Sequence, residues 1–467
     1  MTAASERGES QEAARARLSG IRPIPAGLRR FGGLDLAVLW GDLAVGLLVL
    51  VTGALLVPAL GLPEALLAIV VGSALGCFPL ALVGLAGARE GVPGMVLFRP
   101  VLGLRGSYIP SVLNLVQLLG WTAFELWAMG SVANAVSKRL FGLDAYPLWL
   151  GVVAIVCTAL ALGGPILVVR RWLERFGVYV VIAVGAWITY KVVSAGGLGE
   201  IWRRPGEGGI PFWLGVDLVI AQPISWLPLV ADYNRFAKRG ASVFAGTYGG
   251  YLLGNVWFYA LGALLVLAVS ASPDVVGIGT QIAAVAGGSV VLIALLAGET
   301  DEAFANIYSW AVSAQNIRPG MSQRALILTV SGLGFVLALF LSIGAYEVFL
   351  FLIGSVFVPL FGVFAADYFA LRRGRYGEPA LFGGEGSSSL RPGIRGRALV
   401  PWVAGFVLYQ WSVPTGPGWW VDAVRSVVHG WLNLPFPLLG SALGASLPSF
   451  ALAFALSLVL LPRYSSS

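Results

Sequence analysis

Four polar or aromatic residues recur along one strongly apolar stretch: Asn114, Gln117, Trp121 and Glu125. Because they are spaced three or four residues apart, they share one face of a helix. A tryptophan ring can stack on a planar heteroaromatic molecule. Amide and carboxylate groups can exchange hydrogen bonds with the edge of such a ring. The pattern favours a binding face for a small heteroaromatic molecule, although hydrogen bonds between helices would use the same groups.

A second polar group interrupts another long apolar stretch and contains Glu299, Thr300, Asp301, Glu302 and Asn306. Apolar residues on both sides place this group well inside the stretch, which argues against a solvated helix end. Oxygen ligands of this kind suit a small cation, and a carboxylate can instead carry a proton. We therefore expect a coupling-ion or proton site here, beside a substrate contact at Asn306.

A third stretch carries two prolines, Pro223 and Pro228, together with Gln222 and Trp226. A proline removes a backbone donor and clashes with the carbonyl four residues earlier, so we expect both prolines to break or kink the helix. The first apolar stretch carries Asp42 between two glycines, which predicts a similar interruption there. Gln222, Trp226 and Asp42 are therefore further candidate substrate contacts.

The composition identifies the elements that must position these groups. The chain has 467 residues, of which 58% are hydrophobic and 11% are charged, and its mean hydropathy is +0.84. Soluble proteins carry about 25% charged residues. The apolar runs are about 20 residues long, as membrane-spanning helices require. We expect an all-α integral membrane protein without a disulfide framework, because both cysteines, Cys77 and Cys157, lie within apolar spans.

Twelve spans are predicted, at residues 35–60, 64–88, 107–137, 147–169, 175–194, 211–232, 243–270, 281–313, 324–344, 346–371, 397–414 and 436–462. Of the 30 basic residues, 24 fall in the amino-terminal tail and alternate loops on one side. Basic loops stay in the cytoplasm. This asymmetry predicts a multi-pass protein of the plasma membrane with both termini cytoplasmic, rather than a nucleic-acid-binding protein.

Interrupted helices at equivalent places in two halves indicate an inverted-repeat transporter with its site near the midplane. The sequence predicts four regions: a tail over 1–33, a transport core over 34–371, a Gly- and Ser-containing cytoplasmic linker over 372–397, and the last two helices over 398–467. Within the core, residues 34–194 and 211–371 are the predicted repeats.

Four segments, Asn114–Ala123, Ser225–Phe236, Ile307–Ala314 and Ala366–Phe369, resemble the nucleobase:cation symporter 1 family, in particular its cytosine permease and hydroxymethylpyrimidine transporter branch. The resemblance covers spans one to ten. It implies a five-plus-five inverted-repeat (LeuT-like) fold with discontinuous helices 1 and 6, two extra carboxy-terminal helices, and sodium- or proton-coupled uptake.

The resemblance also implies residue roles. Trp121 matches the stacking tryptophan of the family, and Asn306 matches a polar residue that contacts substrate. The implied sodium site takes backbone carbonyls near Trp40 and Leu43 together with positions on span eight, and the latter match Ala297, Thr300 and Asp301. A hydroxyl is usual where this chain has Asp301, so the resemblance leaves sodium and proton open as the coupling ion.

The residues alone leave several function classes open. A sodium-coupled transporter of an amino acid or another small molecule would have the same fold, but Glu125 would repel a substrate carboxylate. A membrane-embedded enzyme would need a catalytic cluster or cofactor motif, and a channel would show repeated polar rings. We favour a symporter that imports cytosine, hydroxymethylpyrimidine or a related nucleobase by alternating access, with no organic cofactor.

Overall fold

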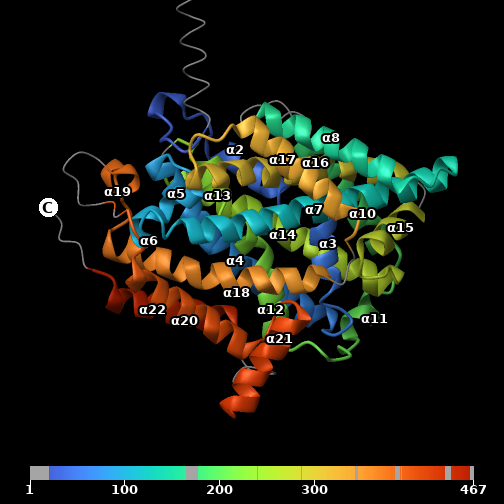
Figure 1. The fold of residues 1–467 in the computed structure, drawn as a ribbon. Coiled ribbons are helices and arrows are strands. Elements are labelled where there is room, and N and C mark those ends of the chain that lie inside the picture. Colours follow the sequence, from blue (N-terminus) through green and yellow to red (C-terminus); the bar gives the residue numbers. More distant parts are fainter. Residues whose placement is uncertain are drawn as a thin grey trace, which may run out of the picture.

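The structure is a computed structural model that describes residues 20–164, 177–238, 240–284, 287–341, 345–383, 390, 392–436 and 443–462. Within these ranges the chain is helical, and one isolated bridge joins Phe31 to Ala237. Figure 1 shows long helices running side by side, with the last helices, α20 and α22, lying along α18.

The helices before the midpoint of the chain are η1 (Ala26–Leu28), α2 (Gly33–Asp42), α3 (Leu47–Ala54), α4 (Leu62–Glu90), α5 (Gly94–Leu97), α6 (Arg99–Leu102), α7 (Tyr108–Phe141), α8 (Tyr146–Gly163), α10 (Val178–Ser194), α11 (Leu198–Arg203), α12 (Phe212–Ser225) and α13 (Val230–Asn234). Those after it are α14 (Ala241–Val269), α15 (Val275–Ala284), α16 (Gly288–Ile317), α17 (Gln323–Ala338), α18 (Tyr346–Ala365), η4 (Ala366–Leu371), α19 (Glu378–Phe382), α20 (Gly396–Ser412), α21 (Gly418–Arg425), η5 (Ser426–Trp431) and α22 (Ser446–Leu460).

Six of the described spans are long and apolar enough to cross a membrane, and the bent pair α2 and α3 makes up to seven. Four further apolar helices, α10, α15, α17 and α22, are 10–17 residues long. The protein is therefore an integral membrane protein, and the twelve-span count stays a prediction. The span expected over 281–313 begins later, because α15 ends at Ala284 and α16 starts at Gly288.

The first span is interrupted as the sequence predicts. Helix α2 ends at Asp42, α3 begins at Leu47, and the two axes differ by 63°. Gly46 lies in this break, close to two acidic side chains. A Cβ atom there would lie 2.5 Å from an oxygen of Glu302 and 2.7 Å from an oxygen of Glu299. The break in the first span therefore packs directly against the acidic segment of α16.

The sixth span is broken, as its two prolines predict. Helix α12 continues through Pro223 to Ser225, and the break covers residues 226–229, which include Pro228. Pro223 itself lies inside the helix, three residues before the break. Proline leaves the carbonyl four residues earlier without its helical donor. The Tyr259 hydroxyl of α14 donates to that carbonyl, on Val219, over 3.4 Å, which supplies a partner inside the protein.

Polar contacts join α20 to α18 and α22 to α20. Trp402 Nε1 of α20 donates to the carbonyl of Val356 over 2.9 Å. Ser449 of α22 donates to Gly405 of α20 over 2.8 Å. The linker contains α19, and residues 384–389 of its Gly- and Ser-rich part lie outside the described residues.

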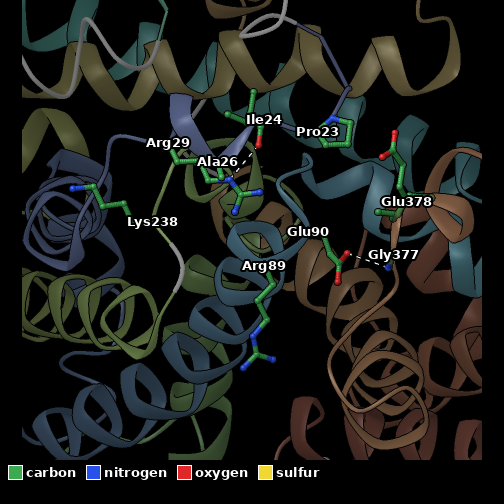
Figure 2. A pocket seen from close by; sticks show the side chains of 10 residues that line it. Pro23, Ile24, Ala26, Arg29, Arg89, Glu90, Lys238, Gly377 and Glu378 are labelled. Atoms are coloured by element: carbon green, nitrogen blue, oxygen red, sulfur yellow. Dashed lines mark hydrogen bonds between the residues drawn. The ribbon is translucent and has the colours of Figure 1, made fainter. Parts of the chain in front are cut away.

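A surface pocket of about 540 Å³ lies where the start of the described chain meets the end of α4 and the segment before α19. Figure 2 shows Arg29 bonded to the Ile24 carbonyl and Glu90 accepting from the Gly377 amide. Ile24 also donates its amide to Gly91 over 2.9 Å. This pocket contains none of the predicted substrate contacts. Hydrogen bonds around this pocket attach residues 20–31 to the ends of the neighbouring helices.

Candidate substrate and cation site

All seven predicted substrate contacts lie inside the helix assembly. Each is at most 5% exposed: Asp42, Gln117, Trp121, Glu125, Gln222, Trp226 and Asn306. They come from the two interrupted spans, from α7 and from α16. Buried polar groups must find partners or bind a ligand, so the partners of each group define what the site can do.

Gln117 joins α7 to the break in span six by a hydrogen bond. Its Nε2 atom donates to the Ser225 carbonyl over 2.6 Å and to Asn114 Oδ1 over 3.1 Å. Ser225 is the last residue of α12, where helical carbonyls lose their normal donors. The Oε1 atom of Gln117 is buried and has no hydrogen-bond partner. Gln117 therefore positions the break and still presents one acceptor.

Gln222 is held by two hydroxyl groups that the sequence did not single out as site residues. Its Oε1 atom accepts from Thr52 over 3.3 Å and from Tyr259 over 3.1 Å. The Thr52 hydroxyl lies 2.9 Å from the hydroxyl of Tyr346, which in turn donates to the Leu48 carbonyl over 3.1 Å. Spans one, six, seven and ten are linked here. A lone tyrosine in an apolar span gives no periodic signal, so sequence reasoning missed both tyrosines.

Trp121 belongs to an aromatic group formed with Phe124, Tyr346 and Phe349. The Trp121 ring meets Tyr346 at 6.1 Å and Phe349 at 5.3 Å between centroids, both edge to face. Phe124 lies 5.5 Å from Tyr346. The indole Nε1 of Trp121 is buried and has no partner. The ring is thus fixed by its neighbours and retains one donor for a ligand.

Trp226 lies in a different aromatic group. Its ring meets Trp40 at 5.9 Å, and Trp40 Nε1 donates to Asn234 Oδ1 over 2.8 Å. Within the described residues, no ring contact joins Trp226 to Trp121. The Trp40 side chain thus packs α2 against α13. Only the backbone of Trp40 is available as a ligand of the sodium site that the resemblance implies.

Five buried carboxylates form two adjoining sets around the break in span one. Asp42 lies beside Asp301. Glu125 of α7 lies beside both Glu299 and Glu302 of α16. The Leu47 amide donates to Glu299 Oε1 over 2.6 Å. Because Leu47 begins α3, Glu299 accepts from the positive end of that helix. Glu299 and Glu302 thus join the site beside the residues predicted for it.

The groups expected to hold a coupling cation supply oxygen atoms. The Thr300 hydroxyl donates to the Ala297 carbonyl over 2.8 Å. The lone pairs of the hydroxyl oxygen therefore remain available to a cation. Asp301 has a buried oxygen without a partner, and Leu43 follows α2 directly at the break. Among the described residues, no three His, Cys, Asp or Glu side chains are arranged to hold a metal ion. The donor set fits a sodium ion bound by carbonyl, hydroxyl and carboxylate oxygens at a helix break.

Several of the buried unpartnered polar atoms lie at the predicted contacts. Six of these residues carry a buried nitrogen or oxygen without a hydrogen-bond partner: Asp42, Gln117, Trp121, Glu125, Asp301 and Asn306. Native proteins leave few such atoms, and each calls for an explanation. Donors (indole and amide nitrogens) and acceptors (amide and carboxylate oxygens) are both present. A small molecule with acceptors and donors on its rim can satisfy them.

Comparisons with known proteins identify the family of the chain. Residues 23–432 match a family model described as "Permease for cytosine/purines, uracil, thiamine, allantoin". The hydantoin permease of Microbacterium maritypicum is 22% identical over 393 residues, which cover 79% of each chain. A putative purine-cytosine permease of Bacillus subtilis is 28% identical over 388 residues, covering 78% of this chain and 81% of the relative. The cytosine permease of Escherichia coli (strain K12) is 25% identical over 353 residues, 75% of this chain and 81% of the relative.

Solved structures show the same fold. A nucleobase-cation-symport-1 family transporter in a closed conformation with bromovinylhydantoin bound has a TM-score of 0.78 at 20% identity, covering 95% of this chain and 96% of that one. A sodium-coupled sialic acid symporter has a TM-score of 0.63 at 11% identity, covering 94% and 92%. The chain therefore belongs to the nucleobase:cation symporter 1 family of cytosine and purine permeases and is a membrane transporter, not an enzyme.

Proposed function

We propose that the protein imports cytosine, hydroxymethylpyrimidine or a related nucleobase together with a cation, by alternating access. The observation that supports this proposal best is the set of unpartnered donors and acceptors beside the Trp121 aromatic group. A flat heterocycle with hydrogen-bonding edges satisfies both features. The names of the cytosine and hydantoin permeases among its relatives support the same substrate class.

In the proposed complex, the heterocycle stacks on Trp121, and Glu125 accepts from an exocyclic amino group. Asn306 donates to a ring acceptor, and Gln117 and Gln222 contact the ring edge. Asp42 and Trp226 line the sides formed by the two interrupted spans. This assignment rests on burial and on the hydrogen bonds already described.

Sodium, or a proton in its place, is the proposed coupling ion. When bound, it supplies positive charge between the break in span one and α16. The carbonyls near Trp40, Leu43 and Ala297 would hold it, together with Thr300 and Asp301. Glu299 accepts a hydrogen bond from the first amide of α3, on Leu47. The residues proposed to hold the cation therefore adjoin a contact that fixes the geometry of the break. Cation binding therefore favours one arrangement of the two helix halves.

The proposed architecture has twelve spans, with inverted repeats at 34–194 and 211–371, a tail at 1–33, a linker at 372–397 and two further helices at 398–467. Both termini are cytoplasmic, and the protein lies in the plasma membrane. The interrupted first and sixth spans support the repeat assignment, because they occupy equivalent places in the two halves.

Uptake assays test this proposal. Cells or proteoliposomes carrying the wild type should accumulate labelled cytosine or hydroxymethylpyrimidine, and Trp121→Ala and Glu125→Ala should each lose most of that uptake. An amino acid that displaces both nucleobases would instead favour the alternative of an amino-acid transporter. Full transport in both variants would overturn the assignment of the site.

A further inference from the structure

An apolar groove of about 560 Å³ lies at the surface of the helix assembly, away from the predicted substrate contacts. Helix α12 forms its floor with Ile220 and Ile224, because α12 packs against both α4 and α18. One wall is formed by Leu75 and Phe78 of α4, which are 36% and 51% exposed. In a protein that spans the membrane, an open apolar groove of this kind meets lipid rather than water.

The opposite wall is aromatic and long. Phe361 of α18 stacks on Phe450 of α22 at 5.4 Å between ring centroids, and Phe450 stacks on Phe454 at 5.7 Å. The residues that line this wall run from Val358 in α18 to Ala370 in η4. At about 1.5 Å per residue they cover about 18 Å of helix. One leaflet of the hydrocarbon core is about 15 Å thick. The groove therefore has the length of a lipid acyl chain within one leaflet.

Two arginines stand at one end of this groove. Phe78 and Leu82 line it at a four-residue spacing on α4, and about two further helical turns on the same face lead to Arg89. Arg373 follows the end of η4. A Cβ atom at Gly374 would lie 2.6 Å from Nη1 of Arg89. The ends of α4 and η4 therefore meet, and both arginines lie at the side that is proposed to face the cytoplasm.

The side chains of Arg89 and Arg373 are exposed, and among the residues that the structure describes neither forms an ion pair with a carboxylate. The neighbouring carboxylate, Glu90, accepts from the amides of Tyr376 over 2.9 Å and Gly377 over 3.3 Å. Figure 2 shows the Arg89 side chain extending away from Glu90. Basic groups between membrane helices on the cytoplasmic side bind anionic lipid headgroups. The end of the groove thus favours an anion, and its length favours an acyl chain.

We propose that the groove is a binding site for one anionic phospholipid. An acyl chain lies over Ile220 and Ile224 and against the Phe450 ring, and the phosphate accepts charge-assisted hydrogen bonds from Arg89 and Arg373. Ile224 lies two residues before the break in span six, so the bound chain covers the helix segment that ends there. The lipid fills the space between the transport core and the last helix and stabilises their packing. This site is independent of which substrate the protein carries.

Matched lipids separate headgroup charge from apolar contact. Phosphatidylglycerol and phosphatidylcholine with the same acyl chains differ in net charge. The purified full-length chain in detergent is incubated with an equal mixture, and native mass spectrometry counts the lipids that it retains. We expect at least about fivefold more phosphatidylglycerol than phosphatidylcholine, because each basic side chain near a lipid headgroup favours the anion about that much. Glycerol phosphate, which lacks the acyl chains, should not displace the lipid.

Variants locate the lipid. Arg89→Gln and Arg373→Gln should each lower the retention of phosphatidylglycerol about fivefold and leave that of phosphatidylcholine little changed. Arg425→Gln is the matched control, because Arg425 is an exposed arginine of α21 that does not line the groove. Ala370→Trp fills the groove and should lower the retention of both lipids, whereas Ala423→Trp, at an exposed position of α21, should not. Size-exclusion profiles establish that each variant is folded, and the arginine variants decide the test if Ala370→Trp is not.

The outcomes are distinct. A preference for phosphatidylglycerol that is lost in Arg89→Gln or Arg373→Gln supports the inference. Equal retention of the two lipids by the wild type, or an undiminished preference in both arginine variants, means ordinary contact with the bilayer and overturns it. A wild-type dimer that Ala370→Trp converts to a monomer would show that a second copy of the chain covers the groove, which also overturns it. None of these results depends on the proposed nucleobase transport.

Discussion

The carboxylate of Asp217, in the middle of α12, accepts hydrogen bonds from the backbone amides of Ala445 over 2.6 Å and Ser446 over 3.1 Å. These amides lie at the start of α22, where helical donors have no partners of their own. Gly444 approaches so closely that a Cβ atom there would lie 2.5 Å from an Asp217 oxygen. An interrupted span of the transport core is thus joined directly to the last helix.

Asp217→Ala should therefore lower stability without touching the substrate contacts. Removing the acceptor leaves two buried amides unsatisfied, and each such group costs about 1–3 kcal/mol. The thermal midpoint of the purified protein should fall by several degrees. Asp422→Ala is the control, because Asp422 of α21 is exposed and its loss should change the midpoint little. Equal midpoints for the Asp217 variant and the wild type would show that the two amides find other partners.

The contact between Gly46 and two glutamates predicts a sharp steric effect. In Gly46→Ala the new methyl group would meet the carboxylates of Glu302 and Glu299, so these two side chains must move from their positions in the site. We expect uptake to fall at least about tenfold, because a displacement of about 1 Å at a binding site can cost that much or more. Gly151→Ala, which adds a methyl group to open space, should transport normally. Normal uptake by the Gly46 variant would mean that this contact is not needed for transport.

Tyr259 is predicted to compensate for Pro223. Tyr259→Phe removes the single hydroxyl proton that the Val219 carbonyl and Gln222 Oε1 share, which should cost about 1–3 kcal/mol of stability. Pro223→Ala restores the backbone donor within α12. In a double-mutant cycle, the Tyr259→Phe substitution should therefore cost less in the Pro223→Ala background. Identical costs in the two backgrounds would show that the carbonyl does not depend on the hydroxyl.

Asp301 is predicted to act on the coupling ion. Asp301→Asn should change the sodium or pH dependence of uptake more than the affinity for the nucleobase, because Asp301 lies beside Asp42 at the break and belongs to the donor set proposed for the cation. Uptake is measured across sodium and pH series with the wild type in parallel. Unchanged coupling together with weakened nucleobase binding would place Asp301 in the substrate site instead.

The sequence predicted the polar face of α7 well, because residues spaced by helical turns share a face wherever the helix packs. Asn114, Gln117, Trp121 and Glu125 are all buried. The exact end of α12 was less predictable, because the carbonyl that Pro223 leaves without its helical donor contacts the Tyr259 hydroxyl, which lies far away in the chain. Tyr346 was missed for a similar reason, since its role depends on Thr52 across the fold.

Trp121 and Glu125 are proposed to form part of a site for a small heterocycle. The most direct measurement is uptake of labelled cytosine and hydroxymethylpyrimidine into proteoliposomes, with and without a sodium or proton gradient, for the wild type and for Trp121→Ala and Glu125→Ala. We expect gradient-driven accumulation of at least one heterocycle by the wild type and loss of most of it in both variants. Accumulation at the wild-type level in both variants would contradict it.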